Sequence, residues 1–262
     1  MASPLTHKRV LQIAVPIVLS NATVPILGVV DTGVVGQLGQ AAPIGAVGIG
    51  AIILTAFYWI FGFLRMGTAG LTAQATGADN KAEVAALLSR SLLIGFAAGA
   101  MMIVGQIPLF WLAFKVSPAS PEVESLARTY MGIRVWSAPA TIGLYGILGW
   151  LIAQERTRAV FGVQVLMNGM NISLDILFVL HFDFGVAGVG WATFMAEWGG
   201  LILGLYLCRD AFTGTDWRDK ARVFDRVRLT RMAVVNTDIL IRSVLLQAIF
   251  VSFLFWGADF GD

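Results

Sequence analysis

The sequence predicts an all-α protein, a polytopic bundle of membrane-spanning helices, and its composition carries this prediction. Of its 262 residues, 57% are hydrophobic and only 13% are charged, whereas about a quarter of the residues of a soluble domain are charged. The mean hydropathy is +0.78. A soluble fold of this size cannot bury so much apolar surface, but membrane lipid can surround it.

Seven long apolar stretches supply the expected helices. Each is long enough to cross a hydrocarbon core, which takes about 20 helical residues. Helices are expected because lipid offers no partners to backbone N–H and C=O groups. The first stretch is too long for the apolar region of a signal peptide, so we interpret it as a span. The stretches cover residues 10–36, 44–75, 84–114, 122–152, 159–180, 186–208 and 229–257.

The positions of lysine and arginine predict the orientation of the bundle. With the N-terminus in the cytoplasm, the outer side holds Lys115, with Arg128 in the helix that follows, and the other basic loop residues lie inside. We therefore expect a multi-pass protein of the bacterial inner (plasma) membrane, with its seventh helix ending outside. The basic residues expected on the cytoplasmic side are Lys8, Arg9, Lys81, Arg156, Arg158, Arg209, Arg218, Lys220, Arg222, Arg226 and Arg228.

A charged segment divides the chain. Residues 209–228 carry charges of both signs and predict a cytoplasmic linker. Residues 1–208 then form an N-terminal six-helix lobe, and residues 229–262 form the first helix of a second, truncated lobe. The single cysteine, Cys208, excludes an internal disulfide and a cysteine metal cluster. We expect no cofactor and no nucleic acid partner.

Polar residues inside the expected spans carry the functional signal, because a charge at the centre of a bilayer costs about 2.5–3.5 kcal/mol on insertion scales. Asp31 lies near the outer end of the first span. In the fifth span, Asn168, Asn171 and Asp175 fall within about 60° of one another on the helix. They form one polar stripe on an otherwise apolar helix.

Polar residues on three different spans are expected to lie at the same depth in the membrane. Asp31 and Asp175 each lie about five residues, or roughly 7–8 Å of helical rise, before the outer end of a span. Thr193 lies about as far inside the sixth span, one turn from Glu197, which we expect in a second layer around the site. Two carboxylates at one depth repel in a medium of low dielectric, so uptake of a proton is expected. With the neighbouring amide and hydroxyl oxygens, the same carboxylates could equally hold Na⁺.

A structural interpretation of these residues competes with the functional one. A single aspartate near a helix end is often a satisfied interfacial residue, and an Asn–Asn–Asp stripe can be an interhelical hydrogen-bond seam. The first span also contains Pro16 and Pro25, which lack backbone donors and let a helix bend. We expect them to act as a conformational hinge.

Five segments resemble the MATE (multidrug and toxic compound extrusion) family, and in particular its DinF-like branch. The resemblance covers essentially the whole chain and is specific as a set. The segments are 30–36 (VDTGVVG), 61–70 (FGFLRMGTAG), 168–175 (NGMNISLD), 185–188 (GVAG) and 236–242 (NTDILIR).

The resemblance implies the six-helix N-lobe of a MATE-type transporter plus the first helix of the C-lobe. Such a protein is a secondary antiporter that exports drugs or other amphiphilic or cationic organic compounds in exchange for H⁺ or Na⁺. The resemblance assigns the coupling ion to Asp31 and Asp175, with Asn171 and Thr193 in the same network, and bending of the first helix to Pro16. Family members are about twice as long and built as two lobes, so a second chain could supply the missing lobe.

Other functions fit the sequence less well. A flippase for a lipid-linked substrate should have a basic cavity for phosphate, whereas the expected cavity is acidic. A non-transporting, truncated membrane component is a third reading. A retinal protein would need a lysine in the seventh span for its Schiff base, and residues 229–257 contain no lysine. A membrane enzyme is disfavoured because neither H-E-x-x-H nor G-x-S-x-G occurs in the sequence.

Overall fold

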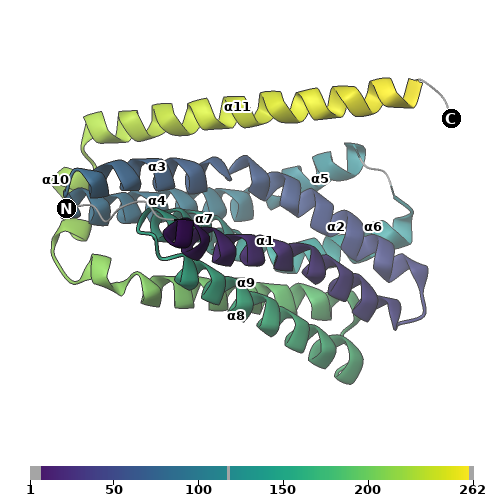
Figure 1. Ribbon diagram of the computed structural model, residues 1–262. Helices are drawn as coiled ribbons and strands as arrows, with labels where there is room; N and C mark the ends of the chain where they lie inside the picture. The colour runs from purple at the N-terminus through teal and green to yellow at the C-terminus, as the bar shows by residue number, and fades with distance from the viewer. Residues whose placement is uncertain (1–6, 117–118, 260–262) are drawn as a thin grey trace.

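The structure, a computed structural model of the chain, describes residues 7–116 and 119–259; in parts of the first and last helices it describes the backbone alone. The described residues form helices and turns, which confirms the predicted all-α class (Figure 1). The main helices are α1 (His7–Gly36), α2 (Ala41–Ile60), α3 (Phe63–Gly77), α4 (Lys81–Val104), α5 (Gln106–Val116), α6 (Pro121–Arg134), α7 (Ala138–Ala153), α8 (Thr157–Asp175), α9 (Gly185–Leu207) and α11 (Arg226–Asp259).

Five helical stretches within the described part of the chain are long and apolar enough to cross a membrane, judged by length and composition. They correspond to the second to sixth predicted spans. The first and seventh predicted spans lie on α1 and α11, which are 30 and 34 residues long. The five stretches are Ala41–Gly77, Lys81–Val104, Pro121–Ala153, Thr157–His181 and Gly185–Leu207.

Three predicted spans are interrupted, which their apolar runs did not reveal. The second divides at Phe61 and Gly62 into α2 and α3, and the third divides at Gly105 into α4 and α5. The fourth divides at the 3-10 turn Val135–Ser137, after which Pro139 lies in the first turn of α7. Proline has no backbone N–H, so it fits the start of a helix and cannot continue the preceding one.

Close helix packing holds the site-bearing helices together. α7 packs against α3, α4 and α9, while α8 packs against both α1 and α9. At the crossing of α4 and α7, a Cβ atom on Gly99 would overlap the backbone of Pro139. Membrane helices associate through such close packing, because lipid tails are as apolar as the helices themselves. The side-by-side arrangement of α1, α8 and α9 is the part of this frame that builds the candidate site.

The last helix runs along one edge of the bundle. α11 packs against α3, where Gly67 leaves room for the side chain of Asn236. The segment predicted as a linker, 209–228, forms the short turns η3 (Arg209–Phe212), η4 (Asp216–Arg218) and α10 (Lys220–Val223) before α11 begins. We call the end of the bundle that carries these turns the linker end. The division of the chain into lobes stays a prediction.

Candidate functional site

Asp31 and Asp175 meet where α1 packs against α8. Asp175, the last residue of α8, is completely buried, and Asp31 on α1 is partly buried. Their carboxyl groups lie within reach of a side-chain hydrogen bond to each other. The structure therefore brings together the two carboxylates that the sequence placed at one depth.

The oxygens of this pair lack a hydrogen-bond donor. Oδ1 of Asp31, both side-chain oxygens of Asp175 and Oδ1 of Asn171 are buried without a hydrogen-bond partner among the described residues. An ionised carboxylate can only accept hydrogen bonds, and an uncompensated buried charge is costly. A proton shared between the carboxyl groups, or a cation bound by these oxygens, would supply what the pair lacks.

Asn171 and Thr193 join α8 to α9 beside the carboxyl pair. Asn171 Nδ2 donates to Thr193 Oγ1 at 3.1 Å, and the Thr193 hydroxyl donates to the carbonyl of Val189 at 3.0 Å. These bonds use the amide nitrogen, so the amide oxygen is the atom of Asn171 left for a ligand. Asn168 is also buried. All three polar residues of the predicted stripe therefore face the interior of the bundle.

The helix geometry changes directly after Asp175. Residues Ile176–His181 form a π-helical turn, η2, which packs against α9. Such turns are rare and occur frequently at functional sites. The periodicity of the sequence predicted a regular helix here, because one extra residue in a turn leaves no mark on an apolar run. Asp175 thus lies where α8 stops being a regular α-helix.

A buried arginine that was not among the predicted site residues lies beside the pair. Arg134, at the end of α6, lies within electrostatic range of both Asp31 and Asp175. Its Nη1 donates to the Tyr130 hydroxyl at 3.0 Å. The sequence does indicate this residue, because Arg134 falls inside the predicted span 122–152. An arginine within a membrane span is as strong an indicator of function as an aspartate.

Glu197 is the counter-ion of this arginine. It lies one turn beyond Thr193 on α9, and its Oε1 is 2.6 Å from Nη2 of Arg134. Ser137 Oγ also donates to Glu197. Glu197 is therefore bound to Arg134 instead of contacting the aspartates directly. The arrangement places a fixed, compensated positive charge next to the carboxyl pair.

The prolines of the first helix do not interrupt it. α1 is continuous from His7 to Gly36. Pro16 is partly buried, and the side chain of Pro25 lies outside the described residues. The hinge expected at these prolines stays a prediction.

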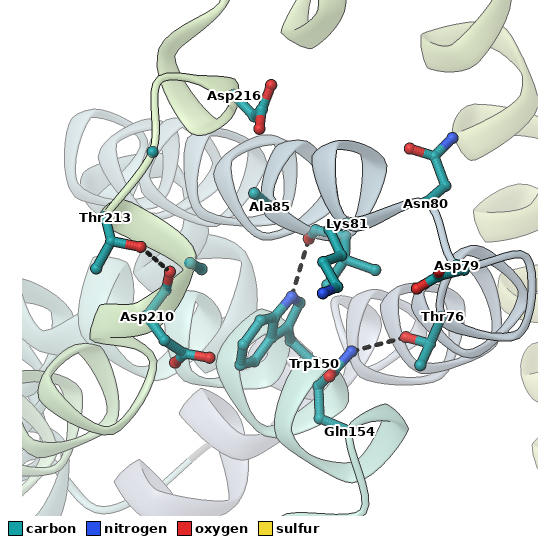
Figure 2. Close-up of a pocket in the computed structure, with 13 residues that line it drawn as sticks. Thr76, Asp79, Asn80, Lys81, Ala85, Trp150, Gln154, Asp210, Thr213 and Asp216 are labelled. Atoms are coloured by element: carbon teal, nitrogen blue, oxygen red, sulfur yellow. Dashed lines mark hydrogen bonds between the residues drawn. The ribbon is translucent and has the colours of Figure 1, made fainter.

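A separate polar cavity of about 470 Å³ opens at the linker end (Figure 2). The indole nitrogen of Trp150 donates to the carbonyl of Val84 at 2.9 Å and holds α7 against α4 there. The carboxylates that line this cavity lie on different sides of it in Figure 2. In the described part of the chain, no group of three His, Cys, Asp or Glu residues is placed to bind a metal ion. These carboxylates are Asp79, Asp210 and Asp216.

Fold and site together define the class of protein. It is a polytopic helical membrane protein with charged groups enclosed at its core, and such groups mark ion or substrate pathways in membrane proteins. The MatE family model matches residues 16–177. The chain therefore belongs to the MatE family, which confirms the resemblance seen in the sequence. The family is one of transporters and not of enzymes.

The chain is also similar to curated proteins that are longer than it is. DNA damage-inducible protein F of Escherichia coli (strain K12) is 36% identical over 266 residues, covering 98% of this chain and 56% of that protein. The probable multidrug resistance protein NorM of Shewanella oneidensis is 27% identical over 203 residues, covering 74% of this chain and 43% of that protein. The chain spans about half the length of the curated relatives it matches.

Solved structures share the fold. A MATE protein in its bent conformation superposes with a TM-score of 0.71 at 22% identity, covering 76% of this chain and 44% of that one. A MATE protein in the straight conformation gives 0.70 at 21% identity, covering 79% and 46%. A MOP superfamily transporter from Pyrococcus furiosus gives 0.71 at 21% identity, covering 77% and 44%. These likenesses confirm the predicted helix-bundle fold.

Proposed function

We propose that this chain forms the ion-coupling lobe of a secondary antiporter, which exports drugs or other amphiphilic or cationic organic compounds in exchange for H⁺ or Na⁺. The single observation that carries the proposal is the buried pair Asp31 and Asp175, whose carboxyl groups face each other without a donor. Membership of the MatE family supports the class of reaction.

A proton suits this pair because it supplies the missing donor. When one carboxyl group carries a proton, it donates to the other, and the pair becomes one hydrogen-bonded unit between α1 and α8. When the proton leaves, two negative charges face each other at low dielectric. The nearby positive charge, Arg134, is already paired with Glu197 and offsets this repulsion only in part. α1 and α8 then repel at this level. Loading and unloading of the proton is thereby coupled to movement of α1.

A sodium ion would use the same atoms. Hard cations take oxygen ligands, and the unpaired oxygens of Asp31, Asp175 and Asn171 are of that type. The Thr193 hydroxyl, which orients Asn171, adds a fifth oxygen nearby. Since protons and sodium ions would occupy one site, each is expected to weaken the binding of the other.

Transport would require a second lobe. The matched region is about half of each curated relative, so we propose that organic substrate binds between this lobe and a second one, on the same polypeptide or on a second chain. The acidic character of the site favours cationic compounds over the phosphate of a lipid-linked flippase substrate. The distribution of lysine and arginine supports a cytoplasmic N-terminus in the bacterial inner membrane.

The test is coupled export in a version of the protein that carries both lobes. Asp31→Asn and Asp175→Asn should each abolish the ion-driven uptake of a cationic dye into inside-out membrane vesicles, in which export appears as uptake. The amount of protein in the membrane should stay unchanged. The matched control is Asp183→Asn, which removes an equal charge from an exposed loop position and should export normally. Undiminished export by both site variants would contradict the proposal.

A further inference from the structure

A basic pocket of about 420 Å³ lies at the linker end, between α3, α4 and the start of α11. It shares no residue with the Asp31–Asp175 site. Three arginines and one glutamate among its lining residues give it a net charge of +2. The polar residues that line it are Gln74, Asn80, Glu83, Arg90, Arg228 and Arg231.

The one carboxylate that lines this pocket, Glu83, is already paired with two arginines. Glu83 Oε1 is 2.7 Å from Nη1 of Arg90, and Glu83 Oε2 pairs with Nη1 of Arg228. Arg90 is 1% exposed and is engaged on its other nitrogens as well, because it donates to the carbonyls of Arg222 and Val223 at 2.8 and 3.0 Å. Arg90 therefore holds the linker against α4, and Glu83 binds Arg90 and Arg228 together. Asp225 also acts electrostatically on Arg90, but among the lining residues one carboxylate faces three arginines, and Arg231 forms no ion pair with it.

What the pocket offers to a ligand is a set of N–H donors. Arg231 Nη2 donates to Gln74 Oε1 at 2.8 Å, and Asn80 Oδ1 accepts from the backbone N–H of Glu83 at 3.1 Å. The amide oxygens are thereby occupied, whereas the amide nitrogens and the other guanidinium N–H groups of Arg228 and Arg231 make no hydrogen bond among the described residues. A guanidinium carries five donors and no acceptor. A complementary ligand must be negatively charged and rich in acceptors.

We propose that this pocket binds a phosphate oxyanion of the kind that an anionic membrane lipid presents at its headgroup. Guanidinium forks match phosphate oxygens in charge and geometry. The depth also fits, because one span-length helical stretch ends at Gly77 and the next begins at Lys81, so the pocket lies where helices leave the hydrocarbon. Basic pockets at this level are known binding places for anionic headgroups.

Binding here would tie the last helix to the rest of the bundle. Arg228 and Arg231 lie on α11, whereas Gln74 lies on α3 and Asn80 directly precedes α4. A phosphate held by both sides joins α11 to the N-terminal helices. A ligand that binds the folded state and not the unfolded one raises the unfolding midpoint by an amount that grows with the logarithm of its concentration above Kd, so the site can be detected by thermal unfolding.

The experiment titrates the purified full chain, in a neutral detergent, with phosphatidylglycerol, with phosphatidylcholine and with inorganic phosphate, and follows the unfolding midpoint. Phosphatidylglycerol should raise the midpoint and phosphatidylcholine should not. Arg231→Gln should weaken the apparent affinity about tenfold, the loss of one charge-assisted contact, and Arg231→Lys should restore part of it. Arg231 is exposed, so these variants are expected to fold.

The matched control is Arg209→Gln, which removes one exposed positive charge at the same end of the bundle but does not line the pocket. It should bind phosphatidylglycerol as the unsubstituted chain does. A response to phosphatidylglycerol alone identifies a lipid headgroup, and a response to inorganic phosphate as well identifies the oxyanion as sufficient. The proposal is overturned if neither anion shifts the midpoint more than phosphatidylcholine does, or if Arg209→Gln loses as much affinity as Arg231→Gln.

Discussion

Nη2 of Arg134 lies 2.6 Å from Oε1 of Glu197 inside the bundle, where these side chains are 10% and 9% exposed. Removing one partner of a buried ion pair leaves an uncompensated charge and costs about 3–5 kcal/mol. We therefore expect Glu197→Leu to lower the free energy of unfolding by that amount, measured by denaturant titration in mixed micelles.

The control for this prediction is the exposed pair Glu124 and Arg128, whose ion-pair distance is 2.7 Å at 33% and 42% exposure. Exposed pairs contribute at most about 1 kcal/mol, so Glu124→Leu should change the unfolding free energy little. If the two leucine variants lose equal stability, Arg134 and Glu197 are not a buried pair in the protein.

Thr193 orients the amide of Asn171, and its substitution should show this. Thr193→Val keeps the shape of the side chain but leaves Asn171 Nδ2 buried without its acceptor. An unsatisfied buried donor costs about 1–3 kcal/mol, so the unfolding free energy should fall by that amount and cation binding should weaken. Thr193→Ser keeps the hydroxyl and should restore both quantities. If the serine variant has as low a free energy of unfolding and binds the cation as weakly as the valine variant, the role of this hydrogen bond is refuted.

Asp210 and Arg156 make the linker end sensitive to acid. Arg156 Nη2 lies 2.5 Å from Asp210 Oδ2, and its hydrogen bond lowers the pKa of Asp210 below the ordinary value. A carboxyl group whose pKa is lowered by folding stabilises the folded state above its unfolded pKa of about 3.9 and loses that contribution as the pH falls through its folded value. Because Asp210 is half exposed, the contribution is below about 1 kcal/mol.

The measurement for this pair is the difference in unfolding midpoint between the unsubstituted chain and Asp210→Asn at several pH values. The unsubstituted chain should be slightly more stable at pH 7, and the difference should begin to shrink near pH 4 and vanish once the pH is below the lowered, folded pKa of Asp210. A difference that persists or grows in acid would show that the ion pair does not form.

Gly99 permits the close crossing of α4 and α7. A Cβ atom there would overlap the backbone of Pro139, so Gly99→Ala must push the helices apart and should cost about 1–3 kcal/mol. Gly169→Ala on α8 meets no atom within 4 Å and should be neutral or stabilising by up to about 1 kcal/mol. Thermal unfolding of the two variants compares them directly, and equal effects would contradict the packing described.

Helical periodicity and depth predicted which polar side chains share a helix face and a level in the membrane. The spacing of Asn168, Asn171 and Asp175 places them on one face whatever the tertiary fold, and the common depth of Asp31 follows from where each span ends. Both are properties of single helices. The structure adds which faces meet, because α1 packs directly against α8.

The interruptions and the buried arginine could not be derived in the same way. Apolar runs continue through Gly62, Gly105 and Pro139, so hydropathy reports one long span where the structure has two helices. The pairing of Arg134 with Glu197 joins residues 63 positions apart, and nothing local to either residue specifies it. The position of Arg134 inside a predicted span was the one feature of the sequence that pointed to it.

The most direct test of the account is whether Asp31 and Asp175 together hold one cation in the isolated chain. Infrared spectroscopy of the chain in lipid nanodiscs should detect a protonated carboxyl group that disappears when the pH is raised or when Na⁺ displaces the proton. Asp31→Asn and Asp175→Asn should each lack this signal, because the new amide donates to the remaining carboxylate, and Asp183→Asn should keep it. A signal that survives in both site variants would contradict the shared site.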